Sequence, residues 1–205
     1  MTEQPEPASA LDDPRLLFFL EHEVQLRDWA ALSSEVFDAV EQTLQRLGLE
    51  IAADPRVAGQ DVRVGEQVKG ETFRAPVLYR DAWCRTAPGI PDVGIALGWD
   101  GKVDPAGLWK GASLPYVGVR TAHQTDAGTA IEAAFRARYK ADPAVLTRDG
   151  ATYRKGAYWP VYRHIKSPDA WWTDIPAWRL MIAGALVDAW GHWAVLVDDA
   201  VAALG

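Results

Sequence analysis

Cysteine, methionine and histidine are scarce in this sequence. Cys84 is the only cysteine among 205 residues, which excludes a disulfide framework and any structural zinc site built from cysteine thiolates. The chain also lacks the basic start and apolar core of a secretory signal, because residues 1–10 are polar and acidic. We therefore expect a cytoplasmic location.

The common catalytic motifs are also missing. The chain has no glycine-rich phosphate loop ending in Gly-Lys-Ser/Thr, no Gly-X-Ser-X-Gly elbow, no His-Glu-X-X-His zinc pair and no dinucleotide fingerprint. No set of residues forms a complete catalytic group. We expect a non-catalytic protein that holds neither a cofactor nor a metal.

The composition that is present is that of an ordinary globular protein, with 49 % hydrophobic and 24 % charged residues. A length of 205 residues favours one compact domain. Residues 1–12 contain two prolines among small and polar residues, which is typical of a frayed end. We predict a leader at residues 1–12 and a single domain at residues 13–205.

Charge is distributed unevenly along the chain, whose formal net charge is −7. Residues 1–61 hold 4 Lys or Arg and 13 Asp or Glu, whereas residues 136–166 hold 8 and 2. An acidic protein is a poor general coat for nucleic acids or membranes, since both surfaces are anionic. The basic stretch 136–166 is the exception, and it is the clearest functional signal of the sequence.

Helical patterns mark both ends of the chain. Asp13-Pro14 is typical of a helix start, and apolar residues recur at helical spacing from residue 15 to 47, with Ser33 and Ser34 as a break and Gly48 as a C-cap. A second helix is predicted over residues 127–140. The last runs from Asp174 to Leu204, and its buried stripe is predicted to include Trp178, Ile182, Leu186, Trp193 and Val197.

Short β-rich runs lie between these helices, at residues 62–68, 73–83, 93–99 and 116–120. Asp100-Gly101 has the composition of a hairpin turn. A polar, aromatic connector follows at residues 141–167, and its Tyr-Trp-Pro-Val-Tyr run at residues 158–162 is interrupted by proline and is not expected to form a regular helix. We predict an α+β fold, in which an antiparallel sheet packs against N-terminal helices and a long apolar C-terminal helix.

The last helix also requires a test against a membrane interpretation, because residues 180–197 are largely apolar over 18 positions. Asp188 lies near the middle of this segment. A charged side chain at the bilayer centre costs about 2.5–3.5 kcal/mol on insertion scales. We therefore expect a buried helix and no membrane contact.

Ten tryptophans are several times the ordinary number, and five of them, Trp83, Trp99, Trp178, Trp190 and Trp193, are predicted core residues. Trp171 and Trp172 are adjacent, so both cannot face the same direction, and at least one is expected at a surface or an interface. This pair favours a non-catalytic recognition protein that binds a protein partner through exposed aromatic residues.

The basic stretch supports an alternative, which is nucleic-acid or nucleotide binding. Cationic side chains bind phosphates and aromatic faces stack on bases, and residues 136–166 interleave both kinds. The candidate residues are Arg154, Lys155, Tyr158, Trp159 and Arg163. The competing interpretation is that these charges are solvated or lie against the acidic N-terminal helices of the same chain.

Three weaker constellations remain as chemical hypotheses. Asp188 and His192 share one helix face at i, i+4 spacing, as a hydrogen-bonded pair or part of a site. Cys84 is either a packing residue or a thiol nucleophile. Another set is similar to the metal-dependent PD-(D/E)XK nucleases and would make the protein a degenerate nuclease; its residues are Asp81, Asp92, Asp100 and Lys102.

Two stretches carry a resemblance to a family. Residues 19–32 are FLEHEVQLRDWAAL and residues 93–100 are VGIALGWD. Both resemble an uncharacterised family of bacterial proteins. The resemblance implies a bacterial-type soluble protein and no particular activity.

Overall fold

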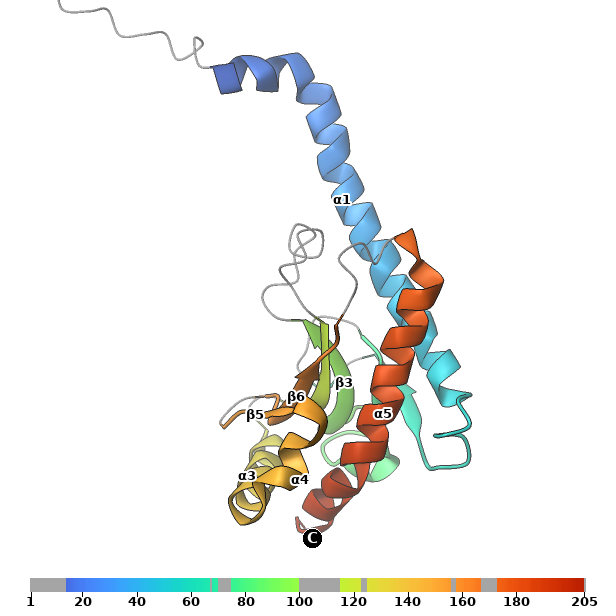
Figure 1. Ribbon diagram of the computed structural model, residues 1–205, viewed down its shortest axis with the longest axis vertical. Coiled ribbons are helices and arrows are strands. Elements are labelled where there is room, and N and C mark those ends of the chain that lie inside the picture. Colours follow the sequence, from blue (N-terminus) through green and yellow to red (C-terminus); the bar gives the residue numbers. More distant parts are fainter. Residues whose placement is uncertain are drawn as a thin grey trace, which may run out of the picture. The chain divides into compact units, whose positions relative to one another are not determined.

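The computed structural model describes residues 14–66, 68–69, 75–99, 115–122, 125–155, 158–166 and 173–204 (Figure 1). The chain divides into two compact units, residues 1–39 and 40–205. The predicted leader at residues 1–12 lies outside the described residues, and the single domain from residue 13 stays a prediction.

Helix α1, Pro14–Ala52, confirms the first predicted helix but is longer than expected. Its irregular point is His22, with φ −118° and ψ 15°, so the break predicted at Ser33 and Ser34 is wrong. The cap predicted at Gly48 is wrong too, because the helix continues for four more residues. A Cβ at Gly48 would lie 2.5 Å from Val64 Cγ1, so this glycine serves close packing rather than termination.

Six strands form one antiparallel sheet in the order β1-β2-β3-β4-β6-β5. Their bounds are Arg63–Gly65 for β1, Val77–Tyr79 for β2, Val93–Trp99 for β3, Pro115–Thr121 for β4, Thr152–Tyr153 for β5 and Val161–His164 for β6. Each of the four predicted runs contains a strand. Strands β5 and β6 lie in the connector, where no strand was predicted. The turn predicted at Asp100-Gly101 lies outside the described residues.

Helix α5, Ile175–Ala202, follows the prediction closely. The Asp174 carboxylate caps it by accepting a hydrogen bond from the Ala177 amide at 3.0 Å. The predicted stripe is confirmed, since all five of its residues are buried: Trp178, Ile182, Leu186, Trp193 and Val197. This helix packs against strands β3 and β4.

Helix α5 is long and apolar enough to cross a membrane by length and composition alone, a criterion that the buried core helix of a soluble protein meets as well. Its buried stripe and its contacts with β3 and β4 fit a core helix. The cytoplasmic location stays a prediction.

Two further helices lie beside α5 and the sheet (Figure 1). Helix α3, Asp126–Ala141, is capped by Thr125, whose hydroxyl accepts from the Gly128 amide, and packs against α5 and β4. Helix α4, Pro143–Thr147, contacts α3 and β5. Short 3-10 turns, η2 at Asp81–Trp83 and η3 at Arg148–Gly150, complete the described elements.

The alternation of strand residues gives the sheet two different faces. Arg163 of β6 reaches Asp188 of α5 and pairs in register with Val117, so Val117 lies on the face toward α5. This helix face is buried and aliphatic, with Ile95, Leu97, Val117, Val119 and Val161. The opposite face, here the aromatic face, carries Gly94, Ala96 and Gly98 of β3, Tyr116, Gly118 and Arg120 of β4, and Tyr162 and His164 of β6.

Candidate binding surfaces

Aromatic rings from two strands and one loop meet on the aromatic face. The Tyr116 ring lies 4.7 Å from that of Trp159 in an edge-on arrangement and 5.2 Å from that of Tyr162. His164 lies edge-on to Tyr162 at 5.5 Å. A Cβ at Gly98 would stand 2.7 Å from both Trp159 and Tyr116, so the two rings lie directly on the strand backbone. The glycine is needed for this close approach.

Arg120 is a buried cation beneath this cluster, with only 7 % of its surface exposed. Its guanidinium carbon lies 4.8 Å from the Tyr158 ring centroid and 5.6 Å from that of Trp159. The Thr121 amide donates to the Tyr158 carbonyl at 2.9 Å, which fixes this part of the loop on the edge of β4. Tyr158 itself remains 43 % exposed. A ligand at this point meets an aromatic face backed by a positive charge.

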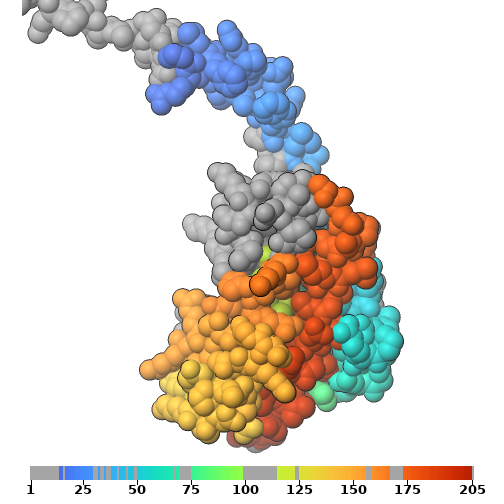
Figure 2. Space-filling model, in the orientation of Figure 1, coloured from blue at the N-terminus to red at the C-terminus, as the bar shows by residue number. Residues whose placement is uncertain are grey.

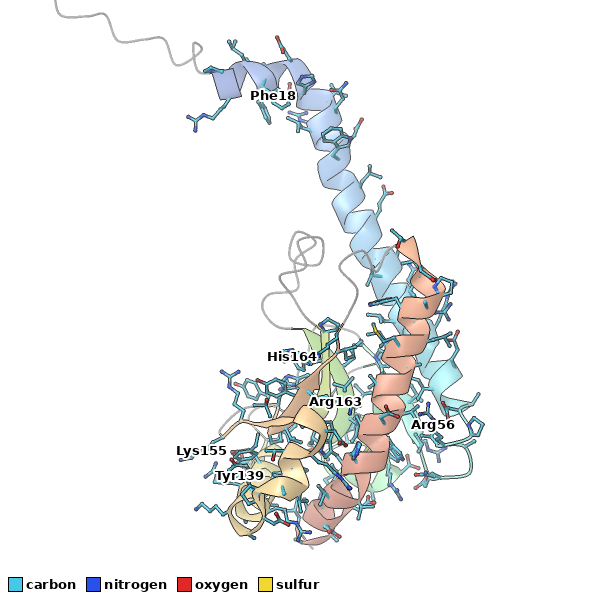
Figure 3. The ribbon with its side chains drawn as sticks, viewed as in Figure 1. Phe18, Arg56, Tyr139, Lys155, Arg163 and His164 are labelled. Carbon is cyan, nitrogen blue, oxygen red and sulfur yellow. The ribbon has the colours of Figure 1, made fainter. Side chains whose placement is uncertain are left out.

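Arg154 and Lys155 begin the loop that joins β5 to β6, and Trp159 lies near its end. The Arg154 amide donates to the Pro160 carbonyl at 3.0 Å. Both basic side chains are exposed, and neither forms an ion pair within the described part of the chain. Four of the five predicted residues of the basic stretch therefore belong to the loop between β5 and β6. Figure 3 labels Lys155 of this loop.

Arg163 is the exception, because it lies on the helix face. Its guanidinium is 3.6 Å from the Asp188 carboxylate, to which Arg56 also donates at 3.0 Å. The ring cluster at His164 is therefore on the other side of the sheet from Arg163. Sequence reasoning grouped Arg163 with Tyr158 and Trp159, and it missed Arg120 and Tyr116, which only the register of β4 with β6 reveals.

Part of the basic stretch is used for packing between α3 and β5. Arg136 pairs with Glu132 at 2.7 Å along α3. The Tyr139 and Tyr153 rings stack at 4.1 Å with an angle of 14° between them. Burial raises the pKa of Tyr153 above its ordinary value. These side chains have structural contacts that a ligand would have to displace.

The predicted tryptophan contacts are only partly described. Trp83, Trp178, Trp190 and Trp193 are buried, as predicted for core residues. Trp171 and Trp172 lie outside the described residues, and so does the Trp99 side chain.

The hypothesis of an Asp188–His192 pair takes a different form in the structure. The carboxylate of Asp188 faces Arg56 and Arg163. His192 Nδ1 instead lies 2.9 Å from the Asp188 backbone carbonyl, and its Nε2 lies 2.8 Å from the Asp149 carboxylate. Asp149 has a left-handed φ of 55°, which the following glycine extends into a turn. The Asp-Gly pair was the available signal for this turn.

The acidic residues of the nuclease comparison have separate partners. Asp92 is fully buried, and its carboxylate accepts hydrogen bonds from the Thr86 amide and hydroxyl. Asp81 pairs with Arg63 at 3.0 Å. Asp100 and Lys102 lie outside the described residues. In the described ranges no three His, Cys, Asp or Glu side chains come together in a way that would hold a metal ion.

Cys84 is half-buried, and its sulfur lies 4.0 Å from the Arg80 carbonyl. Burial raises the pKa of this thiol, which disfavours the thiolate that a nucleophile needs. The packing interpretation of Cys84 is the one that these contacts support.

A further surface lies on residues 14–39, which sequence reasoning treated only as an amphipathic helix. Large apolar side chains are exposed along it: Leu17, Phe18, Phe19, Leu20, Val24, Trp29 and Leu32. Trp29 is 65 % exposed and Val24 71 %. Phe18 contacts the ring of His22 at 4.4 Å, beside the irregular point of α1 (Figure 3).

Comparison with family models, with curated proteins and with solved structures finds no match.

Proposed function

We propose that this chain is a non-catalytic recognition protein that binds a protein partner through the exposed apolar side chains of residues 14–39, with Trp29 as the central anchor. The observation that carries the proposal is the exposure of Trp29 together with Leu32, one turn further along the helix. Trp171 and Trp172 stay predicted additional contacts.

A single helix cannot bury apolar side chains on itself. The exposed side chains of Trp29 and Leu32 leave water only when another surface covers them. Tryptophan removes a large apolar area from water with few rotatable bonds and is enriched among the residues that dominate interface energies. Asp28 and Glu35 flank Leu32 at i, i+4 and i+7 spacing. Charged residues around an apolar centre are the usual arrangement of a protein interface.

The first test asks whether position 29 is accessible in the isolated protein. Because the chain has one cysteine, Cys84→Ser provides a cysteine-free background for Trp29→Cys. We expect a maleimide to label this variant about as fast as a short peptide. Slow labelling of a monomer would show that the chain covers this face itself, and the proposal would be wrong.

The second test measures binding. A partner captured by cross-linking is purified and titrated with the parent chain and with Trp29→Asp. We expect the affinity of the variant to fall about 30-fold or more, the size of a typical anchor effect. Equal affinities for both chains would contradict the proposal.

A second candidate function, binding of single-stranded nucleic acid, is favoured by the aromatic face. Tyr158 and Trp159 are held over the Arg120 guanidinium, and Arg154 and Lys155 begin the same loop. Stacking of bases on aromatic rings, combined with cations for phosphates, is how proteins bind single strands without a sequence code. The described residues of β3, β4 and β6 place no acidic side chain on this face.

This candidate is tested with Arg154→Glu/Lys155→Glu, titrated with short single-stranded DNA and RNA at low and moderate salt. If it is correct, the parent binds with an affinity that falls with salt, and the double variant loses most of it. The matched control is Arg138→Glu/Lys140→Glu, which makes the same charge change on α3. Equal losses in both double variants would indicate non-specific attraction, and no binding by the parent would exclude this function.

A further inference from the structure

The exposed apolar residues around Trp29 follow a seven-residue repeat along α1. Trp29 and Leu32 are both exposed and three positions apart, so they lie on one face of the helix. The same spacing continues in the sequence with Val36 and Ala39. Figure 2 shows the coloured atoms of residues 14–39, in blue, as a rod one helix wide. Apolar residues that recur at alternating steps of three and four form the seam of a coiled coil.

Carboxylates accompany this seam along one side. Asp28 and Glu35 are seven positions apart, so both stand on the same side of the stripe that Trp29 and Leu32 form. Both acidic side chains are exposed, and neither forms an ion pair with another described residue. On the other side of the stripe, the sequence has no charge at positions 26, 33 and 40. A partner that covers the stripe therefore meets carboxylates along one edge only.

Charges beside such a seam decide which helices pair. In a parallel pair of two copies of this chain, Asp28 and Glu35 would lie opposite positions 33 and 40 of the other copy, which offer no cation. In an antiparallel pair they would lie opposite the same two carboxylates of the other copy, and like charges repel. A second copy therefore matches this face in neither orientation.

We propose that the partner is a helix that pairs with residues 23–39 and carries Lys or Arg beside its own apolar seam, at the positions that face Asp28 and Glu35. The inference rests on the proposed function of residues 14–39 and names the chemistry of the partner. Trp29 and Leu32 provide the apolar contact. The two carboxylates select a basic partner and set its orientation.

The first experiment uses a synthetic three-heptad peptide with Ile and Leu along its seam and Lys at both flanking positions. The control peptide has the same seam with Glu in place of every Lys. Like charges keep each peptide from pairing with itself. We expect the parent chain to bind the Lys peptide about tenfold more tightly than the Glu peptide, and Trp29→Asp to weaken this binding about 30-fold or more. Equal affinities for the two peptides, or no binding of the Lys peptide, would overturn the proposal.

The second experiment separates the position of the carboxylates from the net charge. Asp28→Lys/Glu35→Lys is expected to exchange the preference, so that this variant binds the Glu peptide more tightly than the Lys peptide. The matched control is Glu23→Lys/Asp38→Lys, which makes the same charge change on the opposite side of the helix. This control is expected to keep the preference of the parent. If it also exchanges its preference, only net charge acts and the proposal is wrong.

Sedimentation of the parent chain alone tests whether a second copy covers this face. We expect a monomer, and a dimer that Trp29→Asp dissociates would overturn the basic partner. Circular dichroism is expected to show the same helix content in the parent and in every variant. The proposed function fails by a different observation, the slow labelling of Trp29→Cys in a monomer. Fast labelling without binding of the Lys peptide would refute this inference alone.

Discussion

The two faces of the sheet use the same strands in opposite ways. On the helix face, Ile95 and Val119 are fully buried against aliphatic neighbours, and α5 covers them. On the aromatic face, Gly98 leaves room for the rings of Trp159 and Tyr116, and Gly118 leaves room for the backbone of β6. Arg120 holds a charge beneath the Trp159 ring.

Strand alternation assigns each residue to a face, but it does not determine whether that face packs against a helix or remains open to a ligand. Aliphatic side chains of similar size interdigitate and exclude water, so the helix face contributes mainly to stability. A ring that lies on a glycine keeps one of its faces turned outward. A charged group beneath the ring favours particular ligands at that outward face. Substitutions on the two faces should therefore differ in what they change.

The largest effect is expected on the helix face, from Leu186→Asp. Leu186 is fully buried in the stripe of α5, so the substitution places an unpaired carboxylate in an apolar interior. We expect loss of stable folding, seen as the absence of a cooperative thermal transition. A variant with the parent's melting temperature would contradict the assignment of this face.

A smaller effect is expected from glycine substitutions on the aromatic face. A Cβ at Gly118 would lie 2.3 Å from the Val161 carbonyl oxygen, which is backbone, whereas at Gly98 it would meet only the rings of Trp159 and Tyr116. We expect Gly118→Ala to lower the free energy of unfolding by about 1–3 kcal/mol, and Gly98→Ala to cost less because rings rotate away. Chemical denaturation of both variants measures the difference, and the reverse order would show that the rings are rigid.

Removal of one carboxylate tests the polar part of the α5 interface. The Asp198 carboxylate accepts from Trp83 Nε1 at 2.8 Å and lies 3.4 Å from Arg80. Asp198→Ala leaves the buried indole donor without this acceptor, and we expect a cost of about 1–2 kcal/mol in the free energy of unfolding. Asp198→Asn keeps an acceptor and serves as the control. If both variants unfold like the parent, the indole hydrogen bond contributes nothing.

One tyrosine on each face is expected to affect the stability of the protein at alkaline pH. Burial raises the pKa of Tyr79, on the aromatic face, and of Tyr153, on the helix face, above the ordinary 10.0. The folded state therefore retains these protons at pH values at which the unfolded state has lost them. The stability that the two tyrosines contribute is complete below pH 10 and is lost as the pH rises through their pKa values in the folded state. Tyr79→Phe and Tyr153→Phe should each reduce this loss, as measured by denaturation above and below pH 10.0. An unchanged alkaline loss in both variants would exclude the two tyrosines as its source.

The smallest effect is expected from metal ions. His192 and Asp188 make contacts with Asp149, Arg56 and Arg163, which satisfy them without a metal. We expect the melting temperature to be the same with zinc, with manganese and with EDTA. A rise of several degrees that His192→Ala abolishes would instead reveal a metal site.

Much of the fold follows from local pattern. The Asp174 cap and the stripe of α5 were predicted because a cap needs only the next few residues and a buried stripe needs only helical spacing. Strand β3 was predicted with its exact ends, at Val93 and Trp99, since a long β-rich run between turn residues leaves few alternatives. Strands β5 and β6, of two and four residues, were missed because no longer β-rich run surrounds them, whereas the three-residue strands β1 and β2 lie within such runs.

The residues of the aromatic face could not be grouped from the sequence, because tertiary structure brings them together. Tyr116 and Trp159 are far apart in sequence, and only the pairing of β4 with β6 brings their rings together. The same pairing places Arg163 on the helix face, away from the loop residues with which it was grouped in the sequence. By itself the sequence determined the helices, the longest strands and the basic stretch, because these depend on neighbours along the chain. The tertiary structure decided which charges and rings meet, because register and packing join residues that no local pattern connects.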